Sequence, residues 1–240
     1  FEAALNGLLR NIHLRLSAAL IGASGTGKSA LLRAIDDALP DARFRVSYVK
    51  VTGLSKRDLC REVATAIGAK PAGSYPMLVR SIQEHLLGRT EADGLRPVIL
   101  FDDAHEFRPD VLGVLRVLGN FEMDSRLVVS FVLCGQTPLR TLLRRDNLED
   151  VARRLASYAT LRLLSRDESG RYLTHRCCTI AGVDTLPFDT PALDAIYEIG
   201  RGNLRATDQL ARVSLQLASD QDHPVVGSNH VVEARKLLWP

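Results

Sequence analysis

The sequence has few cysteines and no long apolar run, and each shortage excludes a class of protein. Its four cysteines, Cys60, Cys134, Cys177 and Cys178, form no C-x-x-C pair, and no paired His and Cys spacing suggests a zinc site. We expect the adjacent Cys177 and Cys178 to be packed, reduced thiols, which favours a reducing, cytoplasmic compartment over a disulfide-stapled secreted domain. No apolar run approaches the about 20 residues of a membrane span, and no signal peptide opens the chain, so we expect no membrane partner.

The composition is that of a folded domain with a mild excess of positive charge. The chain has 240 residues, of which 46% are hydrophobic and 25% charged, enough to bury a sizeable core. The formal net charge of +3 permits nucleic-acid binding but does not argue strongly for it. We find no internal repeat and no low-complexity tract in the sequence. The first residue is Phe1 rather than Met, so we expect further residues upstream.

The stretch from Gly22 to Ser29 carries the strongest chemical signal. It matches G-x-x-x-x-G-K-[ST], a phosphate-binding loop in which glycines let successive backbone N–H groups face phosphate oxygens. Lys28 is expected to reach the β- and γ-phosphates of ATP, and the Ser29 hydroxyl to bind Mg²⁺. The apolar run before the loop, 16–21, predicts a buried strand, and the spacing after it predicts a helix over 29–39. The predicted nucleotide-binding residues are Gly22, Ala23, Ser24, Gly25, Thr26, Gly27, Lys28 and Ser29.

Asp102 and Asp103 follow a second apolar run and are, respectively, the predicted metal-binding and catalytic carboxylates. The run 98–101 is typical of a buried parallel strand, whose carboxyl end lies at the ligand edge of an α/β sheet. Asp102 would then enter the Mg²⁺ shell, and Asp103 would position or deprotonate the attacking water. The alternative is a strand that ends in a solvated Asp-Asp turn. A third apolar run, 127–133, leads to Gln136, whose side chain is expected to face the γ-phosphate.

The remaining patterns complete an α/β fold followed by a helical segment. The alternating segment 44–51 predicts another strand, and Ser55 is expected to cap a helix over 56–67. Other helices are expected over 77–87, 111–118 and 139–148, with a last strand over 158–164. After Ser165 the helical segments are 166–180, 190–199, 204–218 and 230–238. The predicted fold is a parallel sheet flanked by helices over 1–164, with a small all-α lid domain over 165–240.

The order of these features resembles that of the AAA+ ATPases, and most closely the branch with the ExeA secretion ATPase and the transposition ATPases TniB, TnsC and MuB. The segments that carry the likeness are 101–105, 133–139, 202–205, and Arg154 leading into 161–165. The resemblance covers about 16–238. It implies that Gln136 is the sensor 1 residue, that Arg205 is sensor 2 on the lid, and that Arg154 is an arginine finger acting from a neighbouring subunit. Arg153 is an alternative finger. The alternative for both Arg153 and Arg154 is a solvated basic turn, and the alternative for Arg205 is a surface arginine at the start of a helix.

The chain departs from this family pattern at Asp103, where AAA+ proteins commonly carry Glu. Asp is one methylene shorter, so its carboxylate sits further from the attacking water. We therefore expect ATP binding with Mg²⁺, and ATP hydrolysis that is slow or needs a partner to close the site.

The resemblance implies one of three outputs for the ATPase. A transposition regulator forms ATP-bound homo-oligomers, hexameric rings or helical filaments, on duplex DNA, and recruits a transposase with a targeting factor. An ExeA-like secretion ATPase shares the core but continues into a membrane span and a wall-binding region; this sequence ends at Pro240 with neither, which favours transposition. The third output is a nucleotide-gated protein scaffold with little hydrolysis.

Basic residues near 50–61 are the predicted DNA contacts. In the transposition relatives this segment lies near the central channel of the oligomer, and Lys56, Arg57 and Arg61 are the residues we expect to meet phosphates. Arg57 and Arg61 share one helical face. Such contacts would be sequence-tolerant and salt-sensitive, and the alternative is an ordinary solvated helix face.

Overall fold

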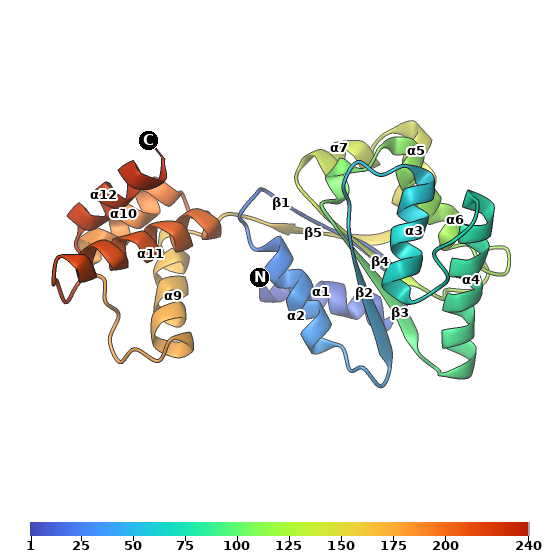
Figure 1. The fold of residues 1–240 in the computed structure, drawn as a ribbon, viewed down its shortest axis with the longest axis horizontal. Helices are drawn as coiled ribbons and strands as arrows, with labels where there is room; N and C mark the ends of the chain where they lie inside the picture. Colours follow the sequence, from blue (N-terminus) through green and yellow to red (C-terminus); the bar gives the residue numbers. More distant parts are fainter. Residues whose placement is uncertain (240) are drawn as a thin grey trace. The chain divides into compact units, whose positions relative to one another are not determined.

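The structure is a computed structural model that describes residues 1–239 (Figure 1). Its internal contacts divide the chain into two compact units. The first unit holds residues 1–22 and 28–161, and the second holds residues 23–27 together with the segment from Arg162 onward. The expected division into domains at 164 and 165 stays a prediction. The five residues at the centre of the phosphate loop are grouped with the helical unit, a feature the sequence did not suggest.

The first unit is built on a parallel sheet. Among the described residues five strands take the order β2-β3-β4-β1-β5, and every neighbouring pair is parallel. The strands are β1 (Ser17–Gly22), β2 (Phe44–Lys50), β3 (Arg96–Asp102), β4 (Ser130–Gly135) and β5 (Leu155–Leu161). The helices are α1 (Glu2–His13), α2 (Lys28–Ala38), α3 (Lys56–Ile67), α4 (Tyr75–Ala92), α5 (Pro109–Leu112), α6 (Val114–Leu118), α7 (Pro138–Leu143) and α8 (Glu149–Arg153). The expected α/β class with a parallel sheet flanked by helices is confirmed.

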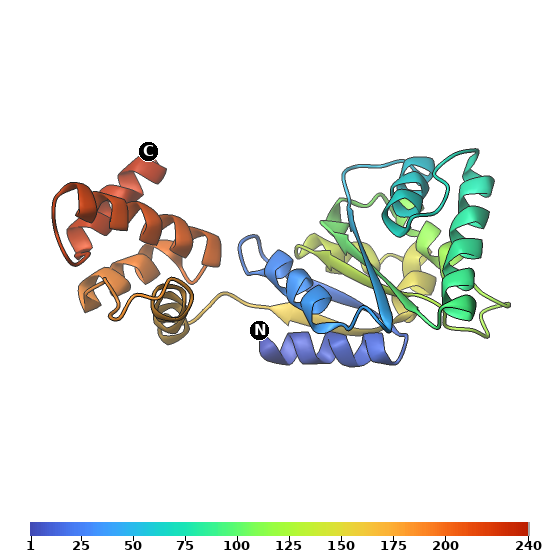
Figure 2. The same cartoon turned by 60° about the horizontal axis from the view of Figure 1, so that its bottom comes forward.

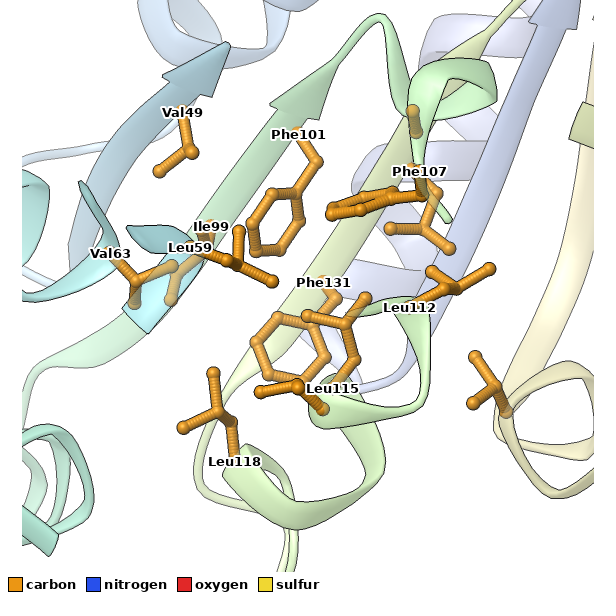
Figure 3. Packing of buried hydrophobic residues seen from close by; sticks show 14 of the residues in the cluster. Val49, Leu59, Val63, Ile99, Phe101, Phe107, Leu112, Leu115, Leu118 and Phe131 are labelled. Atoms are coloured by element: carbon orange, nitrogen blue, oxygen red, sulfur yellow. The ribbon is translucent and has the colours of Figure 1, made fainter. Parts of the chain in front are cut away.

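Alternation along each strand sends side chains to two separate cores. In β3, Ile99 and Phe101 face one core, whereas Leu100 faces the other. Helices α1 and α2 cover the second face, and α3 to α6 cover the first (Figure 2). The larger core gathers around Phe101, whose ring centroid lies 5.8 Å from that of Phe107 and 5.9 Å from that of Phe131 (Figure 3). Because both faces are covered, the strands read as nearly continuous apolar runs.

Several element boundaries differ from the expected ones. The strand expected over 127–133 begins only at Ser130, where β4 starts to pair with β3 at Val98; its pairing with β1 starts later, between Val132 and Ala18. The last strand runs over Leu155–Leu161 rather than 158–164, since its pairing with β1 starts at Ser17. The single helix expected over 139–148 is α7 followed by a short 3₁₀ turn at Asp146–Leu148.

The second unit is helical. Its α-helices are α9 (Arg166–Thr174), α10 (Thr190–Gly200), α11 (Leu204–Asp220) and α12 (Ser228–Leu238), and wider π turns follow α9 over His175–Ile180. They enclose a core of their own that includes Leu173, Ile196, Leu210 and Val231. Ser165 is the N-cap of α9 and forms a capping box, in which the Glu168 carboxylate accepts the backbone N–H of Ser165. Over residues 1–239 we find no helix with the length and apolar character needed to cross a membrane.

Candidate nucleotide-binding site

The register of the sheet brings most of the predicted site residues of the first unit, but not Arg154, to one edge. Parallel strands end on the same side, and here β1, β3 and β4 are neighbours. Ile21 of β1 is level with Gly135 of β4, so Gln136 follows β4 between the end of β1 and the end of β3. Lys28 and Ser29 begin α2, and Asp102 ends β3. We call this side of the sheet the carboxyl edge.

Asp102 is the buried carboxylate of the carboxyl edge. It is 6% exposed, and its Oδ2 accepts hydrogen bonds from Ser29 Oγ at 3.1 Å and Tyr48 Oη at 3.2 Å. Its Oδ1 accepts the backbone N–H of Asp103 at 2.9 Å. Partial desolvation and the nearby Asp102 carboxylate raise the pKa of Tyr48, which is 52% exposed, to about 12. Burial and the same carboxylate raise the pKa of the Cys134 thiol.

These residues fit a bound Mg²⁺. The ion prefers oxygen ligands, and the hydroxyl of Ser29 already touches the carboxylate of Asp102. Lys28 is 8% exposed, and its Nζ donates to the carbonyl of Gly22 at 3.0 Å, which places a cation beside the start of the loop. A hydroxyl, a buried carboxylate and a buried ammonium at one strand edge are the chemistry that a magnesium triphosphate needs.

Asp103 occupies an unusual backbone position. Its φ of 53° lies in the left-handed region, which Asp tolerates better than most residues, and it precedes the 3₁₀ turn Ala104–Glu106. Lys50, at the end of β2, places its Nζ 4.0 Å from Asp103 Oδ2. Both side chains are substantially exposed, so the pair is weak and the carboxylate stays accessible.

Residues of the loop centre contact the start of α11. Asn203 Nδ2 donates to the carbonyl of Ser24 at 2.8 Å, and Arg205 Nη1 lies 3.3 Å from Ser24 Oγ. The backbone N–H of Leu204 donates to the carbonyl of Gly25 at 2.9 Å. Gly25 has a φ of 75°, and a Cβ there would lie 2.1 Å from Asn203 Oδ1, so both conformation and space require glycine. The structure thus brings Arg205, expected to be sensor 2, to the loop residue Ser24.

Arg154 lies on the side of the sheet opposite to the carboxyl edge, which we call the amino edge. It directly precedes β5, whose Leu155 is level with Ser17 at the start of β1. Gly22 at the other end of β1 is level with Leu161. The 7 residues of β5 therefore separate Arg154 from the start of the phosphate loop, about 20 Å at about 3.3 Å per residue.

A family profile described as "AAA domain" matches residues 12–143, more than half of the chain. The chain belongs to the AAA domain family.

Among characterised relatives, General secretion pathway protein A of Aeromonas hydrophila is 32% identical to this AAA domain over 186 residues. The alignment covers 76% of the chain but 33% of that protein, so the chain spans about a third of its relative's length. This likeness and the family match confirm the AAA+ part of the expected resemblance, including its relation to the secretion ATPase. The transposition branch stays a prediction.

Solved structures show the same fold at low sequence identity. The Aeropyrum pernix ORC1 protein in complex with DNA aligns with a TM-score of 0.73 at 17% identity, covering 99% of this chain and 65% of that one. Cdc6p from Pyrobaculum aerophilum gives 0.75 at 20% identity, covering 98% and 64%. The Thermotoga maritima RuvB Holliday junction branch migration motor gives 0.67 at 17% identity, covering 99% and 68%. The chain spans about two thirds of each of these proteins.

The basic residues of α3 in this AAA domain are engaged with their own chain. Lys56 Nζ lies 3.8 Å from Asp110 Oδ2, and Arg61 Nη1 lies 3.2 Å from Asp58 Oδ1. Arg57 donates from Nε and Nη2 to the carbonyl of Gly73, at 3.2 and 3.0 Å. All of these contacts are at the surface, so the three cations remain accessible to phosphates but are not unpaired.

Sequence reasoning missed Tyr48, Asn203 and Asp124 as partners of site residues. Tyr48 had a usable signal, since it shares a strand face with Lys50 and the register brings that face level with Asp102. Asn203 also had one, because Asn before an apolar helical segment is a typical N-cap. Asp124, which bonds Arg154, lies in a loop without a recognisable pattern.

Proposed function

We propose that this AAA domain binds ATP with Mg²⁺ at its carboxyl edge and hydrolyses it to ADP and phosphate between neighbouring copies. The observation that supports this is the separation of Arg154 from Lys28, Ser29 and Asp102 by the length of a strand. No side chain spans about 20 Å, so Arg154 cannot reach the phosphates bound by its own chain. Copies arranged head to tail, in a ring or a helical filament, would bring each Arg154 to the next copy's phosphates.

Each residue has a chemical task in this proposal. Lys28 and the backbone N–H groups of the loop bind the phosphates, and bound Mg²⁺, held by Ser29 and Asp102, would neutralise their charge. Asp103 orients the attacking water and accepts its proton. Because its side chain is one methylene shorter than that of the more common Glu, turnover is slow. The proposed sensor of the γ-phosphate in the first unit is Gln136, which follows β4, and that in the second unit is Arg205 of α11.

The surroundings of Arg154 support its placement at a contact between copies. A cavity of about 250 Å³ adjoins it, with apolar walls that include Leu115, Phe131 and Val151. Leu127, also in this wall, is 52% exposed, whereas Leu115, Phe131 and Val151 are buried. A second copy covering the amino edge would bury Leu127 and close the cavity.

Duplex DNA is the surface on which we propose that the oligomer assembles, with a transposase as the regulated partner. The support is the accessible cluster of Lys56, Arg57 and Arg61 at the start of α3. The shared fold with a DNA-bound ORC1 protein is consistent with this output. Because the contacts would be to phosphates, binding should tolerate any sequence and weaken with salt.

A role in secretion is the second candidate. It is favoured by the 32% identity to General secretion pathway protein A, which exceeds the identity to any of the DNA-related structures above. In that case the same ATP-driven assembly would act on proteins rather than on DNA.

Electron microscopy of the protein with duplex DNA distinguishes these outputs. Samples would contain ATP, a slowly hydrolysed analogue or ADP, each with and without DNA. We expect rings or filaments on DNA only with the triphosphates. Triphosphate-dependent oligomers that ignore DNA would keep the proposed ATPase and select the secretion candidate. Single copies under every condition would contradict hydrolysis between copies.

A further inference from the structure

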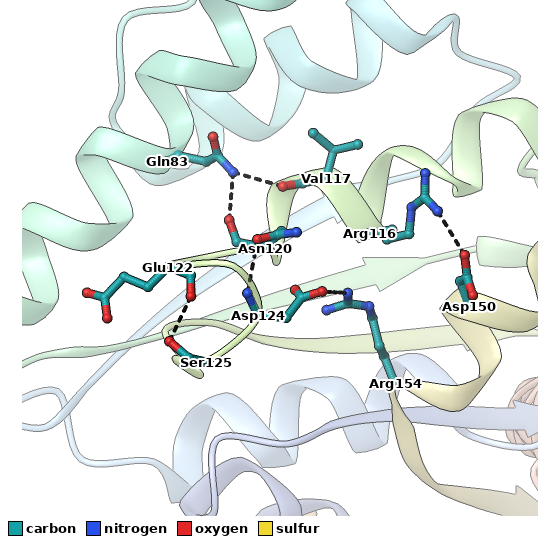
Figure 4. Close-up of polar contacts among 9 residues, drawn as sticks. All are labelled: Gln83, Arg116, Val117, Asn120, Glu122, Asp124, Ser125, Asp150 and Arg154. Atoms are coloured by element: carbon teal, nitrogen blue, oxygen red, sulfur yellow. Dashed lines mark hydrogen bonds and ion pairs between the residues drawn. The ribbon is translucent and has the colours of Figure 1, made fainter.

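The Arg154 guanidinium is held by a carboxylate of its own chain. Arg154 Nη2 donates to Asp124 Oδ2 at 2.6 Å, a short charge-assisted bond between the start of β5 and the loop before β4 (Figure 4). Arg154 retains 35% of its side-chain exposure, and Asp124 retains 43%. The arginine that would serve a neighbouring copy is therefore already occupied, but at a site that solvent and other anions can enter.

The loop that presents Asp124 has a defined and unfavourable backbone. Three consecutive residues, Glu122, Met123 and Asp124, have φ values of 49°, 56° and 65°, in the left-handed region that non-glycine residues rarely enter. The Asp124 backbone N–H donates to Asn120 Oδ1 at 3.2 Å, and Ser125 Oγ donates to the carbonyl of Glu122 at 2.7 Å. Such a conformation persists only where its surroundings fix it.

The base of this loop is anchored to α4 by surface hydrogen bonds. Gln83 Nε2 of α4 donates to the carbonyls of Val117 at 2.8 Å and Asn120 at 3.1 Å, as Figure 4 shows. On the other side, Arg126 pairs with Phe121 in an isolated bridge and binds Glu122 Oε1 at 3.0 Å. The backbone that presents Asp124 to Arg154 is thus held in place by several hydrogen bonds.

We propose that Asp124 is a positioning residue that holds Arg154 in an unassembled copy and is displaced when the phosphates of a neighbouring copy's ATP bind the same guanidinium. This inference rests on the proposed function, in which Arg154 acts between copies. Carboxylate and phosphate oxygens compete for the same N–H donors, so Asp124 opposes assembly until a triphosphate is present. The lowered pKa of Asp124, caused mainly by its bond to Arg154, keeps the competing carboxylate ionised.

The test compares Asp124→Asn with Asp150→Asn. Asn accepts the left-handed backbone as Asp does, so the loop keeps its shape while the charge is lost. Asp150 is the matched control, because its Oδ2 binds Arg116 at 2.8 Å on the same side of the sheet without touching Arg154 (Figure 4). Each variant is measured for ATPase rate against protein concentration, and for ATP-dependent assembly by light scattering.

We expect Asp124→Asn to lower the protein concentration for half-maximal ATPase rate by about two- to fivefold, the effect of releasing one exposed ion pair. Asp150→Asn should leave that concentration unchanged. An unchanged or higher concentration for Asp124→Asn would overturn the inference.

Arg154→Ala separates this inference from the proposed function. If Arg154→Ala removes hydrolysis while Asp124→Asn behaves as the wild type, only the role of Asp124 is wrong. If Arg154→Ala hydrolyses ATP normally, hydrolysis between copies is wrong as well. In the double variant, Asp124→Asn should have no further effect on assembly, because the arginine that it releases is absent.

Discussion

Two aspartates at opposite edges of one sheet differ in burial and in the charge of their hydrogen-bond donors. At the carboxyl edge, Asp102 is buried and accepts bonds from the hydroxyls of Ser29 and Tyr48. At the amino edge, Asp124 is exposed and bonds the guanidinium of Arg154. Hydroxyls stabilise a carboxylate without neutralising it, which leaves the charge of Asp102 suited to a metal ion. The charge of Asp124 is already balanced by a cation that another anion can remove.

The two edges therefore control different parts of the proposed reaction. The carboxyl edge is fixed by strand register and burial, so its polar groups are in place before ATP arrives. The amino edge depends on exposed ion pairs, whose net free energies are small, so its groups can exchange partners. Binding should therefore be a property of one chain, and hydrolysis a property of the assembly.

Arg154→Ala should have the largest effect and tests this division directly. An arginine finger contributes about 10³-fold or more to the rate of phosphoryl transfer, so kcat should fall by that order. ATP affinity, measured by calorimetry on the dilute protein, should be unchanged. Arg153→Ala is the control, since Arg153 is also basic but bonds Glu149 at 2.6 Å, and it should retain most activity. Equal losses in both variants would contradict the choice of Arg154.

Lys28→Ala should produce the next largest effect, on binding rather than on the rate alone. Hydrogen bonds to charged groups contribute about 1.5–3 kcal/mol, so ATP affinity should fall by about 10- to 100-fold. Lys56→Ala, which removes a surface lysine paired with Asp110, serves as the control in the same calorimetric titration. Unaltered ATP affinity in Lys28→Ala would mean that the loop does not bind phosphates.

The double variant Arg57→Ala with Arg61→Ala tests a third charged surface, the basic residues of α3. If both arginines meet DNA phosphates, the slope of log affinity against log salt should fall by about two. ATP affinity should stay the same, because α3 contributes no residue to the carboxyl edge described above. An unchanged slope, measured by fluorescence anisotropy with duplex DNA, would assign these arginines to an ordinary solvated face.

Tyr48→Phe should have the smallest effect and reports on Asp102 without any enzyme assay. The raised pKa means that the phenol stays neutral below pH 10, and that its stabilising contribution is lost as pH rises from about 10 through about 12. A difference absorbance titration, wild type minus Tyr48→Phe, should show one phenol ionising near 12. Mg²⁺ should lower that value, because a cation at Asp102 offsets the charge that opposes ionisation. A phenol that ionises near 10 with or without Mg²⁺ would contradict this placement.

The carboxyl edge could be predicted from sequence because its chemistry is local. The loop lies directly between β1 and α2, and Asp102 directly follows an apolar strand, so neighbours in sequence are neighbours at the site. The fold class and the cap at Ser55 followed from such patterns, and so did the place of the loop between β1 and α2, whereas phosphate binding by that loop stays a prediction. Family resemblance, rather than residue pattern, supplied Arg154 and Arg205. The strand pattern indicated Gln136, and the resemblance gave it the role of sensor 1. All three roles stay predictions.

The amino edge could not be predicted because its contacts are distant and its backbone is atypical. Asp124 and Arg154 are 30 positions apart, and no propensity marks Glu122, Met123 and Asp124 for a left-handed conformation. The apolar residues 127–129 gave a misleading strand pattern, since Leu127 and Val129 line a cavity and all three residues precede β4. Hydrophobic pattern indicates burial, but it does not indicate which neighbour is available to pair.

The grouping of residues 23–27 with the helical unit has a practical consequence for anyone who shortens this chain. The polypeptide crosses between the two units after residues 22, 27 and 161, so no single cut separates them. A fragment ending at 161 would keep every strand of the sheet but lose Asn203 and Leu204, which bond the backbone of Ser24 and Gly25. Deletion mapping would then report a well-folded fragment with poor nucleotide affinity, and would wrongly place the determinants of ATP binding in the C-terminal segment alone.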